Sequence, residues 1–206
     1  MNERTPRRRL AAADRRSQLI EVGRGTFAEM GYEAATVEEI ARRAGITKPI
    51  VYGHFGGKEG LYAAIVEDEA ALVLGAISSA ISVGTPRQRV TAAVLAFLRY
   101  VGERPAGFAV LARDSPASSR YASMLAEIAD RVGAIFAAEF DRAGYDASVA
   151  PIYARELIGM VTYVGQWWDE DRSRPVEEVA SHLAALTWMG LRHLPRKPAA
   201  LTPSET

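Results

Sequence analysis

The chain has 206 residues, of which 49% are hydrophobic and 24% charged, and its formal net charge is zero. A chain of this length can bury a hydrophobic core and form two domains. It contains no cysteine, which excludes disulfide bonds and thiolate chemistry. The arginine-rich N-terminus is not followed by an apolar segment, and the longest charge-free run, residues 70–86, is shorter than the ~20 residues of a spanning helix. We therefore expect a cytoplasmic protein that does not enter the membrane.

A first helix is predicted over residues 12–30, and Gly31 then ends it. Its apolar residues recur along one face at helical spacing: Leu19, Ile20, Gly23, Phe27 and Met30. An arginine-rich arm precedes this helix and extends into its first turn: Arg4, Arg7, Arg8, Arg9, Arg15 and Arg16. Such an arm could reach phosphates or a minor groove, and a solvated, disordered tail is the alternative.

Residues 36–44 predict a short helix with a defined start and stop. Thr36 and Glu39 have the spacing of a capping box, in which the threonine oxygen accepts a backbone N–H and the glutamate reaches back to the cap. Gly45 suits the left-handed conformation that ends a helix, and Ile46 can fill the angle to the next one. The inward-facing residues are one and two turns apart: Val37, Ile40, Ala41 and Ala44.

A second short helix is predicted over residues 48–55, with Thr47 as its N-cap. Pro49 costs little in the first turn, where the N–H groups have no intrahelical partner. Val51 and Phe55 form the inward pair, which leaves the opposite face to Lys48, Pro49, Tyr52 and Gly53. Such a face suits a helix that enters the major groove of DNA. The next residues end this helix and begin a longer one: Gly56, Gly57, Lys58 and Glu59.

Together these residues resemble the DNA-binding domain of the TetR family of bacterial transcriptional regulators. The resemblance covers about residues 10–65 and rests on residues in matching order and spacing: Thr36, Ile40, Ala41, Ala44, Gly45, Ile46, Thr47, Tyr52, Phe55, Lys58, Glu59 and Leu61. It implies an N-terminal three-helix domain with a helix-turn-helix motif that binds double-stranded DNA.

The resemblance also implies which residues contact DNA. Thr36, Tyr52 and Lys58 match phosphate-binding positions. Groove-facing positions and the cap residue complete the expected set: Thr47, Lys48, Pro49, Ile50, Gly53 and His54. Gly53 departs from the family pattern, which has a larger side chain there, so a base contact is missing or is replaced by close backbone approach. Other roles remain open, with Thr36 as a cap only, Tyr52 as a packing residue, and His54 and Lys58 as solvated side chains.

Charge is unevenly distributed although the total is zero. Residues 1–63 hold 11 Lys and Arg against 8 Asp and Glu, whereas the remaining residues hold 14 against 17. The basic part of the chain thus coincides with the motif, as expected for a DNA-binding protein.

The rest of the chain is also predicted to be helical, and no run of residues shows the alternation of apolar and polar residues that is typical of a strand. Thr85, Pro86 and Gln88 supply an N-cap, a first-turn proline and a capping-box glutamine for a helix that starts at residue 86. The other expected helices span about residues 58–82, 105–113, 117–143, 149–169 and 175–193. We predict an all-α protein of about nine helices.

The predicted domain organisation has four parts. Residues 1–13 form a flexible basic arm, 14–62 the DNA-binding domain, 63–194 a larger C-terminal ligand-binding and dimerisation domain, and 195–206 a flexible tail. The last two helices are apolar on nearly all sides, which favours burial by a second subunit over an internal core alone. The resemblance agrees, because TetR-like proteins dimerise through these helices. The expected dimer residues are Leu157, Val161, Trp168, Leu183, Leu186 and Met189.

Aromatic and soft residues in the C-terminal domain could line an apolar pocket for a small molecule, although ordinary core packing also explains them. The expected ligand-binding residues are Phe97, Tyr100, Phe108, Met124, Tyr163 and Trp167. Nearby polar residues could orient a ligand or simply form surface pairs: Arg99, Arg155, Glu156 and Gln166.

No catalytic or metal-binding pattern is present in the sequence. His182 and His193 are 11 residues apart on one predicted helix, about 16 Å at 1.5 Å per residue, too far to share a metal ion. The glycines before Lys58 lack the spacing of a P-loop, and there is no G-x-S-x-G elbow. We expect neither an enzyme nor a metal or organic cofactor.

The expected function is a ligand-responsive transcriptional regulator that binds DNA as a homodimer. We expect a repressor that a small-molecule effector releases from a pseudo-palindromic operator. The alternative is a helical ligand-binding or scaffolding protein without DNA binding. Affinity for DNA that falls steeply with salt distinguishes the first from the second.

Overall fold

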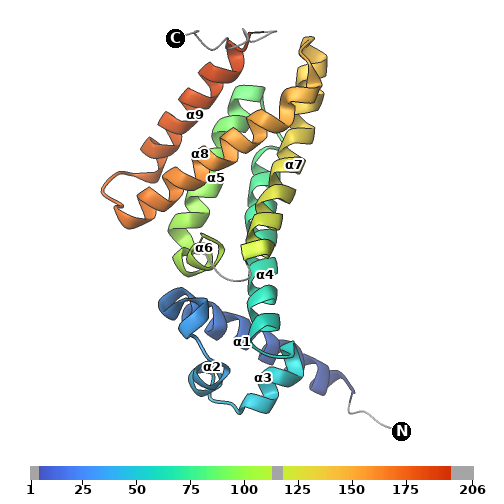
Figure 1. Ribbon diagram of the computed structural model, residues 1–206, viewed down its shortest axis with the longest axis vertical. Coiled ribbons are helices and arrows are strands. Elements are labelled where there is room, and N and C mark those ends of the chain that lie inside the picture. The colour runs from blue at the N-terminus through green and yellow to red at the C-terminus, as the bar shows by residue number, and fades with distance from the viewer. Residues whose placement is uncertain (1–4, 113–117, 196–206) are drawn as a thin grey trace, which may run out of the picture. The chain divides into compact units, whose positions relative to one another are not determined.

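The computed structural model describes residues 5–112 and 118–195, and for residues 5–11, 118–122, 124 and 125 it describes the backbone alone. Within these ranges the chain forms nine α-helices and one 3₁₀-helix and contains no strand, which confirms the all-α class (Figure 1). The elements are α1 (Thr5–Ala34), α2 (Val37–Arg43), α3 (Lys48–Phe55), α4 (Lys58–Ala80), α5 (Pro86–Glu103), α6 (Pro105–Ala112), α7 (Ser118–Ala143), η1 (Ala147–Val149), α8 (Ala150–Glu170) and α9 (Val176–Arg192). Over the described residues, no helix is both long and apolar enough to cross a membrane.

The helices begin and end close to their expected bounds, with one main difference at the N-terminus. Helix α1 starts at Thr5, so the segment expected to be a flexible arm is helical from that residue on. Gly31 has φ of 76° and kinks the end of α1 at the position where the sequence predicted a stop. Thr85 and Gln88 form both bonds of the expected capping box, since each accepts a hydrogen bond from the other's backbone N–H.

The chain folds into two compact units. Unit 1 contains Met1–Ala76 and Tyr100–Met124, and unit 2 contains Ile77–Arg99 and Leu125–Thr206. Unit 1 is thus larger than the expected DNA-binding domain, because part of α4, the end of α5 and α6 belong to it. Helices α4, α5 and α7 each contribute residues to both units.

In unit 1, helices α1, α2 and α3 gather around the first turns of α4 (Figure 1). Gly23 lets α1 and α4 approach closely, since a Cβ there would lie 3.0 Å from Ile65 and 3.1 Å from Leu61. Tyr62 on α4 packs edge-on against Phe27, with ring centroids 5.1 Å apart, and its hydroxyl donates to the carbonyl of Val110 at 2.9 Å. These contacts fix α1 against both α4 and α6.

In unit 2, helix α7 packs against the start of α8. The backbones approach closely at Gly133, where a Cβ would lie in ordinary contact with Cα of Pro151 at 3.6 Å. Phe140 continues the contact, with its ring centroid 5.5 Å from that of Tyr153. At the other end of α8, the indole N–H of Trp168 donates to the carbonyl of Arg174 at 2.9 Å and holds the turn that leads to α9.

Candidate nucleic-acid interface

The turn between α2 and α3 is defined by backbone hydrogen bonds. Thr36 caps α2, and its hydroxyl accepts the N–H of Glu39 at 3.1 Å. At the other end, Gly45 has φ of 65°. The N–H of Ile46 donates to the carbonyl of Ala41 at 2.9 Å and that of Gly45 to Arg42 at 3.2 Å, the pair of bonds of a Schellman motif. The sequence prediction of a cap, a glycine stop and a tight turn is thus confirmed.

The second half of the expected capping box does not form among the described residues. The carboxylate of Glu39 accepts hydrogen bonds from Arg42 and Arg43 at 2.6–2.8 Å instead of from the N–H of Thr36. The hydrogen bonds from Arg42 and then Arg43 lower the pKa of Glu39 to about 2. Arg43 also reaches Glu29 on α1 at 2.6 Å, so these charges join α2 to α1.

The inward faces of α2 and α3 form the base of the motif. Ile40 and Val51 are fully buried, and Ala44 is nearly so. Gln18 on α1 adds a polar tie, because its amide donates to the carbonyl of Ala44 at 3.1 Å. The two short helices are therefore fixed to α1 by side chains that point away from the outward face of α3.

The outward face of α3 is exposed and carries small and polar residues together with two larger side chains, Ile50 and Tyr52. Tyr52 is 53% exposed and Ile50 38% exposed. A Cβ at Gly53 would meet no atom within 4 Å. The structure thus leaves the following expected DNA-binding residues on the surface: Thr36, Thr47, Lys48, Pro49, Ile50, Tyr52 and Gly53. Thr47 is at the N-cap position, and its side chain makes no capping bond.

Two lysines flank this face, and each has a partner that the sequence did not reveal. Lys48 at the start of α3 forms an ion pair with Glu38 on α2, which lowers the pKa of Glu38. Lys58 at the start of α4 donates to the carbonyl of Glu33 at 3.1 Å and lies 4.4 Å from the ring centroid of Tyr32. These cations are positioned by contacts between helices, which spacing along the chain does not show.

The C-terminal end of α3 carries the remaining expected residue. His54 is half-buried beside Phe55, with ring centroids 6.1 Å apart. Arg16 of the arginine-rich segment lies over the Phe55 ring, with 5.3 Å from Cζ to the centroid. Gly56 adopts φ of 74° and ends the helix as predicted.

The residues expected to bind a ligand are divided between the two units. Tyr100 and Phe108 are buried in unit 1, whereas Phe97, Tyr163 and Trp167 belong to unit 2. Tyr163 is 74% and Trp167 48% exposed. The side chain of Met124 lies outside the described residues.

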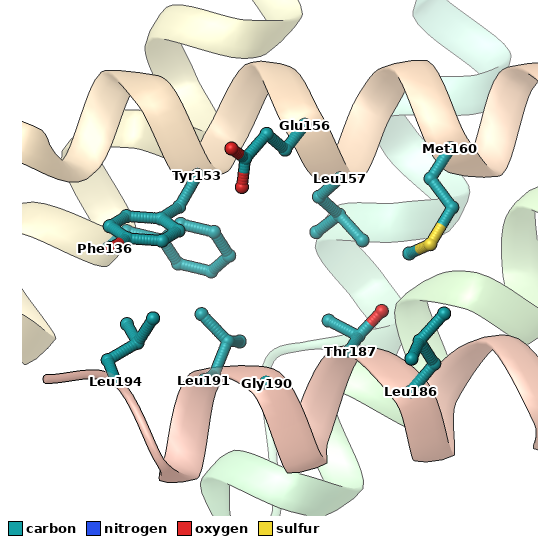
Figure 2. Close-up of a pocket in the computed structure, with 10 residues that line it drawn as sticks. All are labelled: Phe136, Tyr153, Glu156, Leu157, Met160, Leu186, Thr187, Gly190, Leu191 and Leu194. Carbon is teal, nitrogen blue, oxygen red and sulfur yellow. The ribbon is translucent and has the colours of Figure 1, made fainter. Parts of the chain in front are cut away.

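A cavity of about 270 Å³ lies between α8 and α9 in unit 2 (Figure 2). Figure 2 shows Leu157 and Met160 pointing from α8 toward Thr187 on α9. The hydroxyl of Thr187 is buried and has no hydrogen-bond partner. The full lining consists of Phe136, Tyr153, Glu156, Leu157, Met160, Leu186, Thr187, Gly190, Leu191 and Leu194. The sequence pattern identified few of these residues as site residues, because the lining faces of α8 and α9 belong to helices that are apolar on nearly all sides.

The polar residues considered for orienting a ligand have different surroundings in the structure. Glu156 lines this cavity. Arg99 pairs with Glu177 at 3.3 Å and Arg155 with Asp130 at 3.0 Å, both as exposed ion pairs. The surface-pairing alternative therefore holds for the two arginines.

The residues expected at a dimer contact divide into two groups. Val161, Trp168 and Leu183 are each less than 9% exposed within one protomer. These three side chains pack mainly inside unit 2, and their part in a dimer contact stays a prediction. Leu186 and Met189 are 66% and 54% exposed, so they remain available to a second subunit.

Two family models match the chain. The model for bacterial regulatory proteins of the tetR family matches residues 19–65, and that for a tetracyclin repressor-like C-terminal domain matches residues 86–190. The first ends within the first turns of α4, and the second spans α5 to the last turn of α9. Together they cover the helix-turn-helix motif and most of the remaining helices.

Curated relatives and a solved structure agree with these matches. The HTH-type transcriptional activator FasR of Mycolicibacterium smegmatis is 28% identical over 91% of this chain and 87% of its own length. The HTH-type transcriptional repressor AcnR of Corynebacterium glutamicum is 36% identical over 34% of this chain and 39% of its own length. The crystal structure of AibR in complex with isovaleryl coenzyme A and operator DNA has a TM-score of 0.68 at 20% identity, covering 84% of this chain and 97% of that chain.

The exposed face of α3 thus belongs to a motif whose family is established over both parts of the chain. The C-terminal match alone spans residues 86–190, more than half of the chain. The chain belongs to the TetR family of bacterial transcriptional regulators.

Proposed function

We propose that the chain regulates transcription by placing α3 in the major groove of an operator. The observation that carries this proposal is the outward face of α3, where exposed small and polar residues stand on a fully buried base. Because the buried base forms without DNA, the recognition helix is already in position before binding. Little conformational entropy is therefore lost when DNA binds. Lys48 and Lys58 flank this face as expected phosphate or base ligands.

The proposed active form is a homodimer that contacts itself through α8 and α9. Large apolar side chains remain exposed on these helices, and a second subunit that covered them would remove them from water: Ile152, Tyr163, Trp167, Leu186 and Met189. A two-fold dimer presents two recognition helices to half-sites about 34–36 Å apart, which requires a pseudo-palindromic operator.

We assign the cavity between α8 and α9 to this dimer contact. Leu186 belongs to both the cavity lining and the exposed apolar surface. A second protomer seated on α8 and α9 would therefore cover the cavity, and a side chain with a hydrogen-bonding group would satisfy the Thr187 hydroxyl.

The proposed regulation is a population shift driven by a small-molecule effector. Coupling of about 1–3 kcal/mol between the effector and DNA would change operator affinity roughly 5- to 150-fold. AibR, which shares the fold, is in complex with both an acyl coenzyme A and operator DNA, which supports a fold that accommodates the two together. Release of a repressor remains our prediction, although FasR is named an activator. Where the operator lies relative to the promoter decides the sign, and both outcomes require operator binding.

A quantitative gel shift with the DNA upstream of the protein's own gene tests this function. Tyr52→Phe removes a phosphate hydrogen bond and should weaken binding by about 1 kcal/mol, and Lys48→Ala by about 1–3 kcal/mol. Arg131→Ala is the control, because Arg131 is exposed and pairs with Glu127 on α7. If neither α3 variant weakens binding relative to this control, α3 is not the reading helix.

A further inference from the structure

A fully buried carboxylate lies among helices α1, α4, α5 and α6 in unit 1. Glu69 on α4 is 0% exposed. Arg104 donates to both of its oxygens, from Nε at 3.0 Å and Nη2 at 2.6 Å. The hydroxyl of Tyr100 donates at 2.8 Å, and Nε of Arg24 lies 2.6 Å from Oε1. The carboxylate therefore has a bidentate arginine, a second arginine and a phenol as partners.

These partners keep Glu69 charged although it is buried. Burial alone raises the pKa of a carboxyl, but the hydrogen bonds from Arg104 and Tyr100 and the charge of Arg24 outweigh it, so the pKa of Glu69 lies below its ordinary value. Burial, together with the negative charge of Glu69, raises the pKa of Tyr100, which remains a hydrogen-bond donor.

The backbone of α6 also fits around this carboxylate. A Cβ at Gly107 would lie 2.2 Å from Oε2 of Glu69, a distance that forces one of the two to move. Only glycine therefore lets α6 approach the carboxylate as closely as it does. The carbonyl of Arg104 accepts the N–H of Phe108 at 2.9 Å, so Arg104 belongs to the first turn of α6 as well as to the Glu69 cluster.

Two residues of the cluster connect it to neighbouring parts of the chain: Tyr100 to the part of α5 next to unit 2, and Arg24 to the helix that supports the motif. Tyr100 is the first residue of unit 1 on α5, directly after Arg99 of unit 2. Arg24 lies on α1, the same helix on which Gln18 holds the carbonyl of Ala44 at the end of α2. A displacement of α5 along its axis thus acts directly on Glu69, and through Arg24 on the helix that carries the motif.

We propose that Glu69 is a positioning residue that joins the end of α5 to α1 and so transmits movement of α5 to the DNA-reading helices. This inference rests on the proposed function, because it assigns regulation to the same reading face. The cluster holds α1 in one orientation, and its charged, directional bonds permit fewer alternative packings than an apolar contact of the same volume.

A comparison of two replacements separates positioning from stability. Exchanging a buried ion cluster for apolar residues of similar volume is often neutral or stabilising, whereas removing one partner is destabilising. The triple variant Arg24→Met, Glu69→Leu, Arg104→Met is made in a Tyr100→Phe background, so that no buried hydroxyl loses its acceptor. It should therefore keep the thermal stability of the protein. Its α1 should nevertheless lose its single orientation.

Distance measurements between two spin labels provide the readout. The chain has no cysteine, so Ala34→Cys on α1 and Glu103→Cys at the end of α5 give two defined labels, both at exposed positions in unit 1. Labelled protein is diluted with excess unlabelled chain, so that only distances within one chain are recorded. Asp68→Asn is the matched control, because Asp68 is the neighbouring residue and contacts Arg24 at 3.7 Å but is exposed.

We expect one narrow distance distribution for the wild type and for Asp68→Asn, and a broader or shifted one for Glu69→Gln and for the triple variant. Affinity for a duplex that the wild type selects from a random pool should fall roughly 5- to 150-fold in the triple variant, the size of a typical coupling.

A triple variant with the wild-type distance distribution would overturn the proposal. If Glu69→Gln and the triple variant do not fold, Tyr100→Phe, which removes one hydroxyl, decides by the same measurement. A wild type that selects no duplex refutes the proposed function, while the distances still test the role of Glu69.

Discussion

The outward face of α3 and the outward face of α8 and α9 are both exposed, but for different physical reasons. On α3, the exposed residues are small or polar except Ile50 and Tyr52, and the apolar base beneath them, with Ile40 and Val51, is fully buried. On α8 and α9, large apolar side chains such as Tyr163 and Leu186 remain in water. The first surface is mainly polar, whereas the second exposes apolar side chains of the kind found at protein interaction sites, where we place the proposed dimer contact.

The largest effect is expected at Leu186, where a substitution tests whether the exposed face of α8 and α9 is a dimer contact. Leu186→Glu would place an uncompensated charge in the proposed dimer contact, at about 3–5 kcal/mol, or roughly two to four orders of magnitude in dimer affinity. Light scattering coupled to size exclusion measures the change. Val83→Glu is the control, since Val83 is 75% exposed in unit 2 but lies outside α8 and α9. A dimer that persists in Leu186→Glu removes α9 from the contact.

A second prediction compares the inner and outer faces of the motif. Ile40→Ala should lower the free energy of unfolding by about 2–5 kcal/mol, because the removed atoms leave a cavity in a fully buried site. Ile50→Ala, at a position that is 38% exposed, should cost much less stability and act on DNA binding instead. Urea unfolding and a DNA titration measure the two effects. Equal losses of stability would contradict the assignment of the two faces.

The smallest effect concerns Gly53 in the middle of α3. A Cβ there meets no atom of the protein within 4 Å, so Gly53→Ala should raise the stability by roughly 0.5–1 kcal/mol through helix propensity. If DNA approaches the bare backbone, the same methyl group should weaken binding to the operator. Thermal unfolding and a gel shift on one sample test both parts. Higher stability with unchanged DNA affinity would show that the backbone at Gly53 does not approach DNA closely.

The local signals of the sequence predicted the motif well. Thr36, Gly45 and Gly56 act on their own backbone or on residues a turn away, so their spacing alone predicts the helix bounds. The Glu69 cluster could not be predicted in this way, because its partners Arg24 and Arg104 come from positions 45 and 35 residues away along the chain. Only packing of α1, α4 and the end of α5 brings them together.

The dimer and ligand residues show the same limit. Trp168 and Leu183 lie on helices that are apolar on nearly all sides, and periodicity does not tell which side faces the protomer's own core. The structure buries both of them within unit 2 and leaves Leu186 and Met189 exposed. The expected ligand residues show it for a related reason, since an aromatic residue at helical spacing is equally typical of a core and of a pocket.

The central claim, that the face of α3 binds duplex DNA, is tested most directly by the salt dependence of DNA affinity. The logarithm of the affinity should fall linearly with that of the salt concentration, because bound lysines and arginines release counterions from phosphates. Lys58→Ala should weaken binding to all sequences and reduce this slope by about 1, whereas Arg131→Ala should leave it unchanged. Absence of DNA binding at low salt, or a slope that Lys58→Ala does not alter, would contradict the account.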